Sequence, residues 1–588
     1  MSKKTIPIFY SCDDTFIKYT IVSLTSMIQN ASKDYDYRVY ILHTGLSEKM
    51  RAELTKLQNK NFSLSFINLA SRLQDIAYRL PIRDYYSKTT YYRMFIAELF
   101  RGYDKAIYID SDTVVQGDIS ELYEIDIKEN YVGACHEQAM VQVDEYGTYA
   151  EQVVGVSRHA FFNAGMIVIN CQKFREKKVL DKFIKLLGEY NFVVTQDEDY
   201  LNLICKDRVF WLDQRWNTEI FGEIPYPIEE AKILHYIMTS KPWHYADCRH
   251  GDIFWKYAEN TSVYSDIRAE LDAYTDEERA RDAESCDKLL QLAITETNRE
   301  DNYLARLNAK GRSADRVAVL KKIDEYEREG KFDIDVENDP PSKVLMPEDI
   351  NYLSNSIFKK IKTKVAFGAA RLFVRRLIKD KKMIVKEIRG VENFKNLDSG
   401  AVITCNHFNA FDSFAIQMAY DASGHKKRKF FRVIREGNYT SFPGFYGFLM
   451  RNCNTLPLSS NCKTLKKFID ATNTLLKKGN FVLVYPEQSM WWNYRKPKPL
   501  KAGAFSFAVK NEVPILPCFI TMKDTDLIGE DGFPIQEYTV NICSPIHPDM
   551  SLDERDRVKK MMADNTAAWN TVFEEAYGYK PTYITKAQ

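Results

Sequence analysis

The sequence predicts an α/β protein of at least two domains, each built around a mostly parallel sheet. A chain of 588 residues is too long to fold around one hydrophobic core. Over residues 6–110, short apolar runs alternate with segments of helical periodicity, the pattern of strands joined by crossover helices. A second series of the same kind begins near residue 383, after a highly charged stretch.

Composition and cysteine usage exclude several classes of protein. Hydrophobic residues make up 45% of the chain and charged residues 28%, with a net charge of +1, so we expect no nucleic-acid partner. The 11 Cys are scattered without a C-x-x-C pair, which is typical of reduced thiols in a cytosolic protein. The N-terminus lacks the apolar segment of a signal peptide, and the chain lacks a long uncharged apolar run that could span a membrane.

Three strands separated by helices are predicted in the first part of the chain. Residues 6–10, 37–42 and 64–68 are apolar runs rich in β-branched and aromatic side chains. Ser47 is placed to cap the second helix. The apolar stripes of the predicted helices are Ile17, Ile21, Leu24 and Ile28; Met50, Leu54 and Leu57; and Tyr92, Phe95, Ile96 and Leu99. No G-x-G-x-x-G follows the first strand, so the dinucleotide fingerprint is absent.

Two carboxylates follow the strand that begins at Ala106. The strand stops on Asp110, and Asp112 lies just beyond Ser111. In open α/β sheets, ligands bind beyond the carboxyl ends of the strands. Hard oxygen ligands suit Mg²⁺ or Mn²⁺, and such an ion suits a diphosphate. Asp-x-Asp is also a common turn sequence, so the pair alone leaves a plain turn open.

Further blocks follow one another in order over residues 1–262. They are Asp13-Asp14, Tyr92-Arg93, Tyr108 to Thr113, Phe162 to Gly165, Gln196 to Asp199 with Leu201-Asn202, and His235-Tyr236 with Lys241-Pro242-Trp243. In this order the blocks resemble glycosyltransferase family 8, the retaining group that includes glycogenin and bacterial lipopolysaccharide galactosyltransferases. The resemblance implies a Rossmann-like domain of GT-A type that binds a UDP-sugar.

The resemblance also implies a role for each position. Asp110, Asp112 and His235 would hold Mn²⁺ or Mg²⁺, which would neutralise the UDP leaving group. Asp13 would contact the base or ribose of the nucleotide, and Arg93 the diphosphate or sugar. Lys241 would contact the diphosphate, and Asn163 with Asp197 the sugar hydroxyls. Ser111 and Gly165 would also belong to the nucleotide-sugar site. Taken singly, His235 reads as a core histidine and Asn163 to Gly165 as a tight turn before a strand; their joint occurrence favours the site.

Three departures from the family pattern stand out. Glu198 occupies a place where many members carry Gln, so beside Asp197 it would be either a nucleophile near the anomeric carbon or a group that weakens binding. Thr15-Phe16 replaces the Asn-Tyr often found beside the base. Met238 stands where some members have Gly, which puts a backbone contact to phosphate there in doubt.

Residues 263–350 are highly charged, with sparse Leu and Ile at helical intervals. This pattern predicts a helical spacer that is either a packed mini-domain or an interaction surface.

Residues 351–382 are basic and amphipathic. The apolar positions are Phe358, Ile361, Val365 and Leu372, and the cations are Lys359, Lys360, Lys362, Lys364, Arg371, Arg375 and Arg376. This pattern suits a helix lying on an anionic membrane surface, and a domain-capping helix is the alternative.

A second centre of chemistry follows the strand beginning at Ala401. His407 and Asp412 lie between this strand and a predicted helix over 413–418. There the Asp can orient the imidazole, which is the general-base pair of acyl transfer without a protein nucleophile. A lone His-x4-Asp is weak, because the spacing is common by chance.

The blocks that follow give the pair a context. They are Arg435-Glu436, Pro443-Gly444 with Arg451, Pro486-Glu487-Gln488-Ser489, and the apolar run from Val513 to Pro517. This order resembles the glycerophospholipid acyltransferases, such as 1-acyl-glycerol-3-phosphate acyltransferase, over residues 383–588. The resemblance implies His407 as general base, Asp412 as its partner, Arg435 and Arg451 at an acceptor phosphate, and Glu487 positioning the acceptor. Gln488-Ser489-Met490 replace Gly-Thr-Arg, so the arginine is missing, and Arg495 is a nearby substitute.

Together these observations predict a bifunctional transferase. One half would move a hexose from a UDP-sugar to a glycan or glycolipid acceptor, and the other an acyl group from acyl-CoA or acyl carrier protein to a lipid or glycolipid hydroxyl. The alternative is a glycosyltransferase anchored by an inactive, lipid-binding acyltransferase-like domain. We expect a cytoplasmic protein, peripheral on the inner face of the cell membrane.

Overall fold

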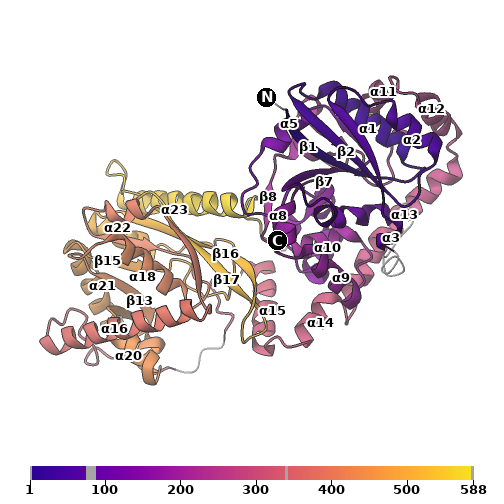
Figure 1. The fold of residues 1–588 in the computed structure, drawn as a ribbon. Helices are drawn as coiled ribbons and strands as arrows, with labels where there is room; N and C mark the ends of the chain where they lie inside the picture. The colour runs from indigo at the N-terminus through magenta and orange to yellow at the C-terminus, as the bar shows by residue number, and fades with distance from the viewer. Residues whose placement is uncertain (1–2, 74–87, 338–341, 584–588) are drawn as a thin grey trace. The chain divides into compact units, whose positions relative to one another are not determined.

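The computed structural model describes residues 3–73, 88–337 and 342–583, and the chain divides into two compact units (Figure 1). Unit 1 is Met1–Leu307 and unit 2 is Asn308–Gln588. Each has its own seven-stranded sheet covered by helices, which confirms the α/β fold class for both halves.

The main sheet of unit 1 has the strand order β3-β2-β1-β4-β7-β6-β8. Its strands are β1 (Lys4–Ser11), β2 (Tyr35–His43), β3 (Phe62–Asn68), β4 (Lys105–Ile109), β6 (Val132–His136), β7 (Phe162–Asn170) and β8 (Val209–Trp211). β1 to β4 pair in parallel, whereas β7 runs antiparallel to both β4 and β6. A small second sheet contains β5 (Thr113–Val115), β9 (Thr218–Glu219) and β10 (Ile233–His235). The strands expected over 6–10, 37–42 and 64–68 are therefore present.

Both faces of this sheet are buried. The helices of unit 1 include α1 (Ile17–Asn30), α2 (Glu48–Thr55), α7 (Asp144–Tyr149), α9 (Val179–Glu189), α10 (Asp197–Ile204), α11 (Gly251–Ala258), α12 (Tyr264–Ala273) and α13 (Asp276–Asn298). Ile8 of β1 lies in the same core cluster as residues of α1 and α11, while its neighbour Phe9 lies in the other cluster, which contains residues of α9 and α10. This alternation is what a strand between two helical layers requires. Ser47 caps α2, as its side chain accepts a hydrogen bond from the Met50 amide.

One local expectation was wrong, and one alternative is excluded. The stripe from Tyr92 to Leu99 does not form one amphipathic helix: a 3-10 segment, η1 (Lys88–Phe95), is followed by a single turn, α4 (Ile96–Leu99). The block from Asn163 to Gly165 is not a turn before a strand, because it lies inside β7. The antiparallel pairing with β4 holds it extended.

The charged stretch 263–350 is shared between the two units. α13 belongs to unit 1, where Leu289 and Ala293 lie in the same core as Tyr149. α14 (Tyr303–Ala309) contains the division, and α15 (Ala314–Arg328) belongs to unit 2. Its Val319 is buried there with Trp492.

The sheet of unit 2 has the strand order β11-β17-β16-β12-β15-β13-β14. Its strands are β11 (Ile384–Arg389), β12 (Ala401–Thr404), β13 (Phe430–Arg435), β14 (Thr455–Leu458), β15 (Phe481–Val484), β16 (Ile515–Ile528) and β17 (Pro534–Ile542). β16, β12, β15, β13 and β14 are parallel neighbours, so their carboxyl ends meet at one edge. The strand expected around Val513 to Pro517 is the start of β16.

Helices cover both faces of this sheet as well. They include α16 (Ile357–Lys379), α17 (Val391–Lys395), α18 (Asp412–Ser423), α20 (Gly444–Asn452), α21 (Cys462–Lys477), α22 (Gly503–Asn511) and α23 (Glu554–Tyr577). Ile403 of β12 lies in one core cluster with residues of α17 and α18, and Val402 lies in another with residues of α21 and α22. Within the described residues, no helix has both the length and the apolar character needed to cross a membrane. None of the 11 Cys, all of which lie in the described residues, forms a disulfide bond.

Candidate active sites

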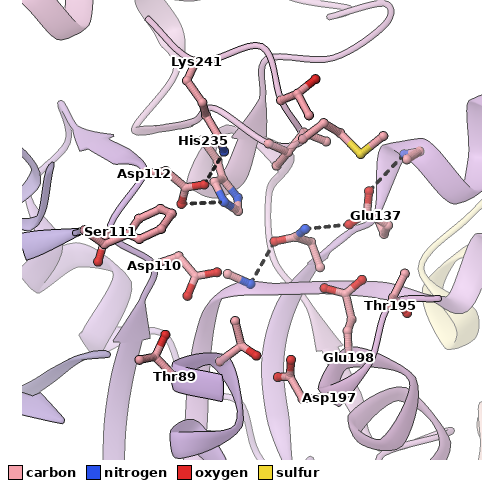
Figure 2. Close-up of a pocket in the computed structure, with 18 of the residues that line it drawn as sticks. Thr89, Asp110, Ser111, Asp112, Glu137, Thr195, Asp197, Glu198, His235 and Lys241 are labelled. Atoms are coloured by element: carbon pink, nitrogen blue, oxygen red, sulfur yellow. Dashed lines mark hydrogen bonds and ion pairs between the residues drawn. The ribbon is translucent and has the colours of Figure 1, made fainter. Parts of the chain in front are cut away.

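A cavity of about 200 Å³ in unit 1 brings most of the predicted residues together (Figure 2). Its lining includes Arg93, Asp110, Ser111, Asp112, Asn163, Gly165, Asp197, Glu198, His235 and Lys241. These residues come from η1, the loop after β4, the first part of β7, the start of α10, the end of β10 and the loop that follows β10. Positions spread over some 150 residues thus face one space, because the strands that carry them are neighbours in the sheets.

One side of the cavity has the donor set for a divalent cation. Asp110, Asp112 and His235 each offer a ligand atom, and these atoms lie within 4.8 Å of one another. The Tyr108 hydroxyl donates to Asp110 Oδ1 (2.6 Å), and His235 Nε2 lies 3.2 Å from Asp112 Oδ1. Two carboxylates and one imidazole suit Mn²⁺, so the residues present fit the ion that the sequence predicts.

Neighbouring groups orient these ligands. Asn217 Oδ1 lies 3.1 Å from His235 Nδ1, which leaves Nε2 on the side of Asp112. Lys241 Nζ lies 2.6 Å from Asp112 Oδ2. Burial alone would raise the pKa of Asp112, but the positive charges of Lys241 and His235 hold that pKa below its ordinary value. Asp112 is therefore an ionised ligand at neutral pH.

Gly165 is a glycine because there is no room for a side chain. A Cβ at this position would lie 2.3 Å from His235 Cε1 and 2.8 Å from Asp110 Oδ2. The close approach is fixed by the backbone, since the Asp110 amide donates to the Gly165 carbonyl (2.7 Å). Gly165 therefore leaves the room that the predicted cation ligands Asp110 and His235 need, and it also lines the cavity.

Arg93 lines the cavity and lies beside two of its carboxylates. Its Nε lies 2.9 Å from Asp197 Oδ2 and its NH2 lies 3.7 Å from Asp110 Oδ1, and it is almost fully buried. It also donates to the Ala164 carbonyl. In this structure Arg93 holds protein groups in place, and contact with a diphosphate remains a prediction.

The opposite side of the cavity holds a group of buried acids. Glu198 Oε2 accepts from the Ala164 amide (2.8 Å), and Glu137 Oε2 accepts from Asn163 Nδ2 (2.5 Å). Burial and the proximity of Glu137 raise the pKa of Glu198 well above its ordinary value, and the same causes act on Glu219. The raised pKa of Glu198 favours its protonated form, so this side of the cavity can hold a proton.

Two of the predicted contacts lie differently. Asp13 is not part of the cavity lining: its Oδ1 accepts from the amides of Thr15 (3.0 Å) and Phe16 (3.1 Å) at the entry to α1, and Phe16 reaches the cavity instead. Ser111 lines the cavity, but its hydroxyl lies 2.8 Å from that of Thr20.

Sequence reasoning missed several groups at this site. Glu137 follows β6, and Asn217 joins Asn163 to His235 through a hydrogen bond to Asn163 Oδ1 (2.9 Å). Asp282, from the charged stretch, lines the cavity and accepts from the Tyr245 hydroxyl (2.9 Å). Glu137 could have been suspected as a carboxylate at a strand end, whereas nothing in the sequence marks Asn217 or Asp282.

A second constellation lies at the carboxyl edge of the unit 2 sheet. His407 follows β12, and its Nδ1 lies 2.7 Å from Asp412 Oδ2. Asp412 is 1% exposed at its side chain and His407 is 22% exposed, so the acid is interior and the imidazole is accessible. Because Nδ1 faces Asp412, Nε2 is the nitrogen left to a substrate hydroxyl.

Tyr485 and Glu487, which follow β15, fix this pair. The Tyr485 hydroxyl donates to Asp412 Oδ1 (2.7 Å), and its ring stacks on His407 with centroids 4.1 Å apart. Glu487 is buried and accepts from the amides of His407 (3.0 Å) and Lys498 (2.8 Å). Burial raises the pKa of Glu487. Glu487 therefore positions the His407 loop, and Tyr485 is a part of the site that the sequence did not reveal.

The predicted acceptor arginines are engaged by the protein itself. Arg435 NH2 lies 2.5 Å from Asp335 Oδ1. Arg451 donates to the carbonyls of Tyr439 (3.1 Å) and Phe442 (3.2 Å). Arg495 lies 2.8 Å from Asp524, so it does not take the place of the missing arginine beside Glu487.

Comparison with known proteins assigns the two units. Residues 7–247 match the sequence profile described as Glycosyl transferase family 8, and residues 386–521 match the profile described as Acyltransferase. The chain joins a family 8 glycosyltransferase domain to an acyltransferase domain. It is thus an enzyme with glycosyl-transfer and acyl-transfer domains, while the 1-acyl-glycerol-3-phosphate subtype is not established.

Relatives of the glycosyltransferase domain include bacterial enzymes. A putative glycosyltransferase from Haemophilus influenzae is 29% identical over 268 residues, which cover 43% of this chain and 78% of the relative. The lipopolysaccharide 1,3-galactosyltransferase of Salmonella typhimurium is 26% identical over 253 residues, 40% of this chain and 72% of the relative. Similar solved structures include the bifunctional glycosyltransferase WbbM, with a TM-score of 0.40 and 24% identity over 45% of this chain and 52% of that one. Another is the galactosyltransferase LgtC with donor and acceptor sugar analogs, with a TM-score of 0.37 and 24% identity over 45% of this chain and 100% of that one.

The contact at Gly165 gives a direct test of the first site. Gly165→Ala should lower sugar-nucleotide turnover by about 10²-fold or more, because the new methyl group displaces His235 or Asp110 and misplacements near 1 Å cost this much. Gly102→Ala is the control, since a Cβ there meets nothing within 4 Å. Turnover of UDP-hexoses and thermal unfolding are measured for both. A folded Gly165→Ala protein with wild-type turnover would contradict the assignment.

Proposed function

We propose that the chain is a bifunctional transferase acting at a membrane. Unit 1 would transfer a hexose from a UDP-sugar to a glycan or glycolipid acceptor with retention, assisted by Mn²⁺ or Mg²⁺. Unit 2 would transfer an acyl group from acyl-CoA or acyl carrier protein to a lipid or glycolipid hydroxyl. The observation that carries the proposal is that each unit presents a complete set of reacting groups beside strand ends: Asp110, Asp112 and His235 in one, and His407 with Asp412 in the other.

In unit 1, different side chains would bind the cation, the diphosphate and the sugar. A bound divalent cation would stabilise negative charge on the departing diphosphate. Asp110 and Asp112 would hold it, His235 would complete the set with its Nε2, and Lys241 would add positive charge beside Asp112. Glu198 and Asp197 lie across the cavity, where the sugar would face a carboxyl group held by the Ala164 amide.

In unit 2 the chemistry is general-base catalysis. His407 Nε2 would accept the proton of the acceptor hydroxyl as its oxygen attacks the thioester carbonyl. The imidazolium would then give this proton to the departing thiolate as the carbon–sulfur bond breaks, so that the products are the ester and the free thiol. Asp412, held by Tyr485, would stabilise the protonated imidazole. This intact pair favours an active domain over the anchor alternative.

Metal dependence tests the first half of the proposal. Asp110→Asn should abolish sugar transfer that Mn²⁺ or Mg²⁺ supports, because a neutral amide is a poor ligand for a hard cation. Asp104→Asn, an exposed position at the other end of β4, is the control. Initial rates are measured with UDP-hexoses in Mn²⁺, Mg²⁺ and EDTA. Equal rates in EDTA would sink the metal assignment.

Separation of the two activities tests the second half. His407→Ala should lower acyl transfer by about 10²–10⁴-fold, the usual cost of losing a general base, while sugar transfer stays intact. Asp110→Asn should do the reverse. His547→Ala, at an exposed histidine, is the control. Radiolabelled acyl-CoA and UDP-hexose are followed in parallel, and acyl transfer unchanged in His407→Ala would rule out the proposed base.

The membrane location rests on α16 and α20. Ile357, Phe358 and Leu372 of α16 are 71%, 80% and 67% exposed, and cationic side chains lie between them. On α20, Phe445 and Tyr446 are 43% and 47% exposed and pack on Phe373 of α16 with ring centroids 5.5 and 5.7 Å away. Exposed apolar side chains beside lysines and arginines suit an anionic lipid surface on the cytoplasmic side.

Vesicle flotation tests this location. Changing Lys359, Lys360, Lys362 and Lys364 to Glu should reduce recovery on phosphatidylglycerol vesicles, and added salt should weaken wild-type binding, because both act on charge attraction. The matched control changes Lys463, Lys466, Lys477 and Lys478 to Glu, four exposed lysines on and beside α21. If the two quadruple variants float equally well, α16 is not the binding surface.

A further inference from the structure

In the acyltransferase unit, an acidic segment of the chain forms ion pairs with basic residues at the sheet edge that carries His407 and Asp412. We define the acidic strap as residues 332–337, with the sequence Phe-Asp-Ile-Asp-Val-Glu. Asp335 lies 2.5 Å from Arg435, at the end of β13, and Asp333 lies 2.9 Å from Lys501. The Lys501 amide in turn donates to the Pro486 carbonyl (2.9 Å), one residue before Glu487. The strap carboxylates therefore lie at the same strand ends as the His407 loop.

The strap is held by interactions other than these ion pairs. Ser489 Oγ donates to the Phe332 carbonyl (2.6 Å), and Trp491 Nε1 donates to the Ile334 carbonyl (2.8 Å). Val336 is 1% exposed in an apolar cluster with Trp491 and Trp492. Exposed ion pairs alone contribute little to stability. Because buried contacts anchor the backbone, Asp333 and Asp335 stay beside their partners even where the pairs themselves are weak.

The other cations of this region are also engaged by the protein. Lys498 is buried, and its Nζ donates to the carbonyl and hydroxyl of Ser489 (2.5 and 2.8 Å). Burial lowers the pKa of Lys498 to about 8, while Glu487 and Asp335 act in the opposite direction. Arg432 is buried in β13, donates to Gln417 Oε1 and lies over the Phe430 ring.

From these contacts we infer that the strap makes Asp333 and Asp335 specificity-determining residues, so that the acyl acceptor is the hydroxyl of an uncharged lipid. This inference rests on the proposed acyl transfer. A phosphate monoester needs a cation with free donors, such as a bidentate arginine, to replace its water. At this edge it would meet Arg435 and Lys501 already paired and two fixed carboxylates that repel it. Met490 stands where the family's arginine would be, which removes one further donor.

The test compares acceptors on the full-length protein in neutral detergent micelles with radiolabelled palmitoyl-CoA. The acceptors are lysophosphatidate, a monoacylglycerol and a monohexosyl monoacylglycerol. We expect the wild type to acylate one or both uncharged acceptors and to use lysophosphatidate poorly. The double variant Asp333→Asn, Asp335→Asn should raise the relative rate with lysophosphatidate about 10-fold, since it frees both cations and removes both repelling charges.

A matched control separates charge at the site from damage to the strap. Glu337 belongs to the strap but pairs with Arg316, so Glu337→Gln breaks a strap ion pair without freeing Arg435 or Lys501. It should keep the wild-type acceptor preference. Circular dichroism and thermal unfolding show that each variant is folded, and the sugar-transfer rate reports separately on unit 1.

The outcomes distinguish this inference from the proposed function. Preference of the wild type for lysophosphatidate, or an unchanged preference in the double variant, would overturn the strap's role and leave acyl transfer standing. Acyl transfer to none of the three acceptors, with sugar transfer intact, would overturn the proposed activity of unit 2 and this inference with it.

Discussion

The close approach of β7 to β4 is the constraint on which the first site depends. The two strands run antiparallel, and the Asp110 amide is bonded to the Gly165 carbonyl at 2.7 Å. This contact places a residue with no side chain against two of the predicted cation ligands, so that Asp110 and His235 can converge. The same start of β7 presents Asn163 to Glu137 and the Ala164 amide to Glu198. One strand pairing thus joins the cation side of the cavity to its acidic side.

The second site depends on a comparable fixed point. Glu487 uses both carboxylate oxygens on backbone amides, one of them the amide of His407 itself. A buried carboxylate that accepts two N–H groups is well satisfied, so the loop after β12 has little freedom to move. Tyr485, from the same strand end, then restrains Asp412 and the imidazole together. The accessible base is therefore supported by three groups that never need to touch the substrate.

Parts of both sites were predictable because they sit in short sequence blocks at strand ends. The parallel strands, Asp110 with Asp112, and His407 with Asp412 are local patterns, and their positions follow from apolar periodicity and loop position. Gly165 was predicted as a site residue, but its position inside β7 was not predicted, because an antiparallel partner distant in sequence holds it in the strand. Asn217, Asp282 and Tyr485 have no local signature at all. Their roles come from neighbours brought together only by the fold, as when Asn217 links His235 to Asn163.

The two sites treat charge in opposite ways. The glycosyltransferase site concentrates carboxylates around one cavity, an arrangement that suits the proposed cation and the charged diphosphate that this cation would help to leave. In the acyltransferase unit, two basic side chains near the site, Arg435 and Lys501, form ion pairs with Asp335 and Asp333 of the acidic strap. Their positive charges are thereby neutralised by the chain itself. A sugar hydroxyl carries no charge, so a glycolipid made by a UDP-sugar reaction would meet the acceptor requirement inferred for the second unit. The shared requirement gives a chemical reason for one chain to carry both domains.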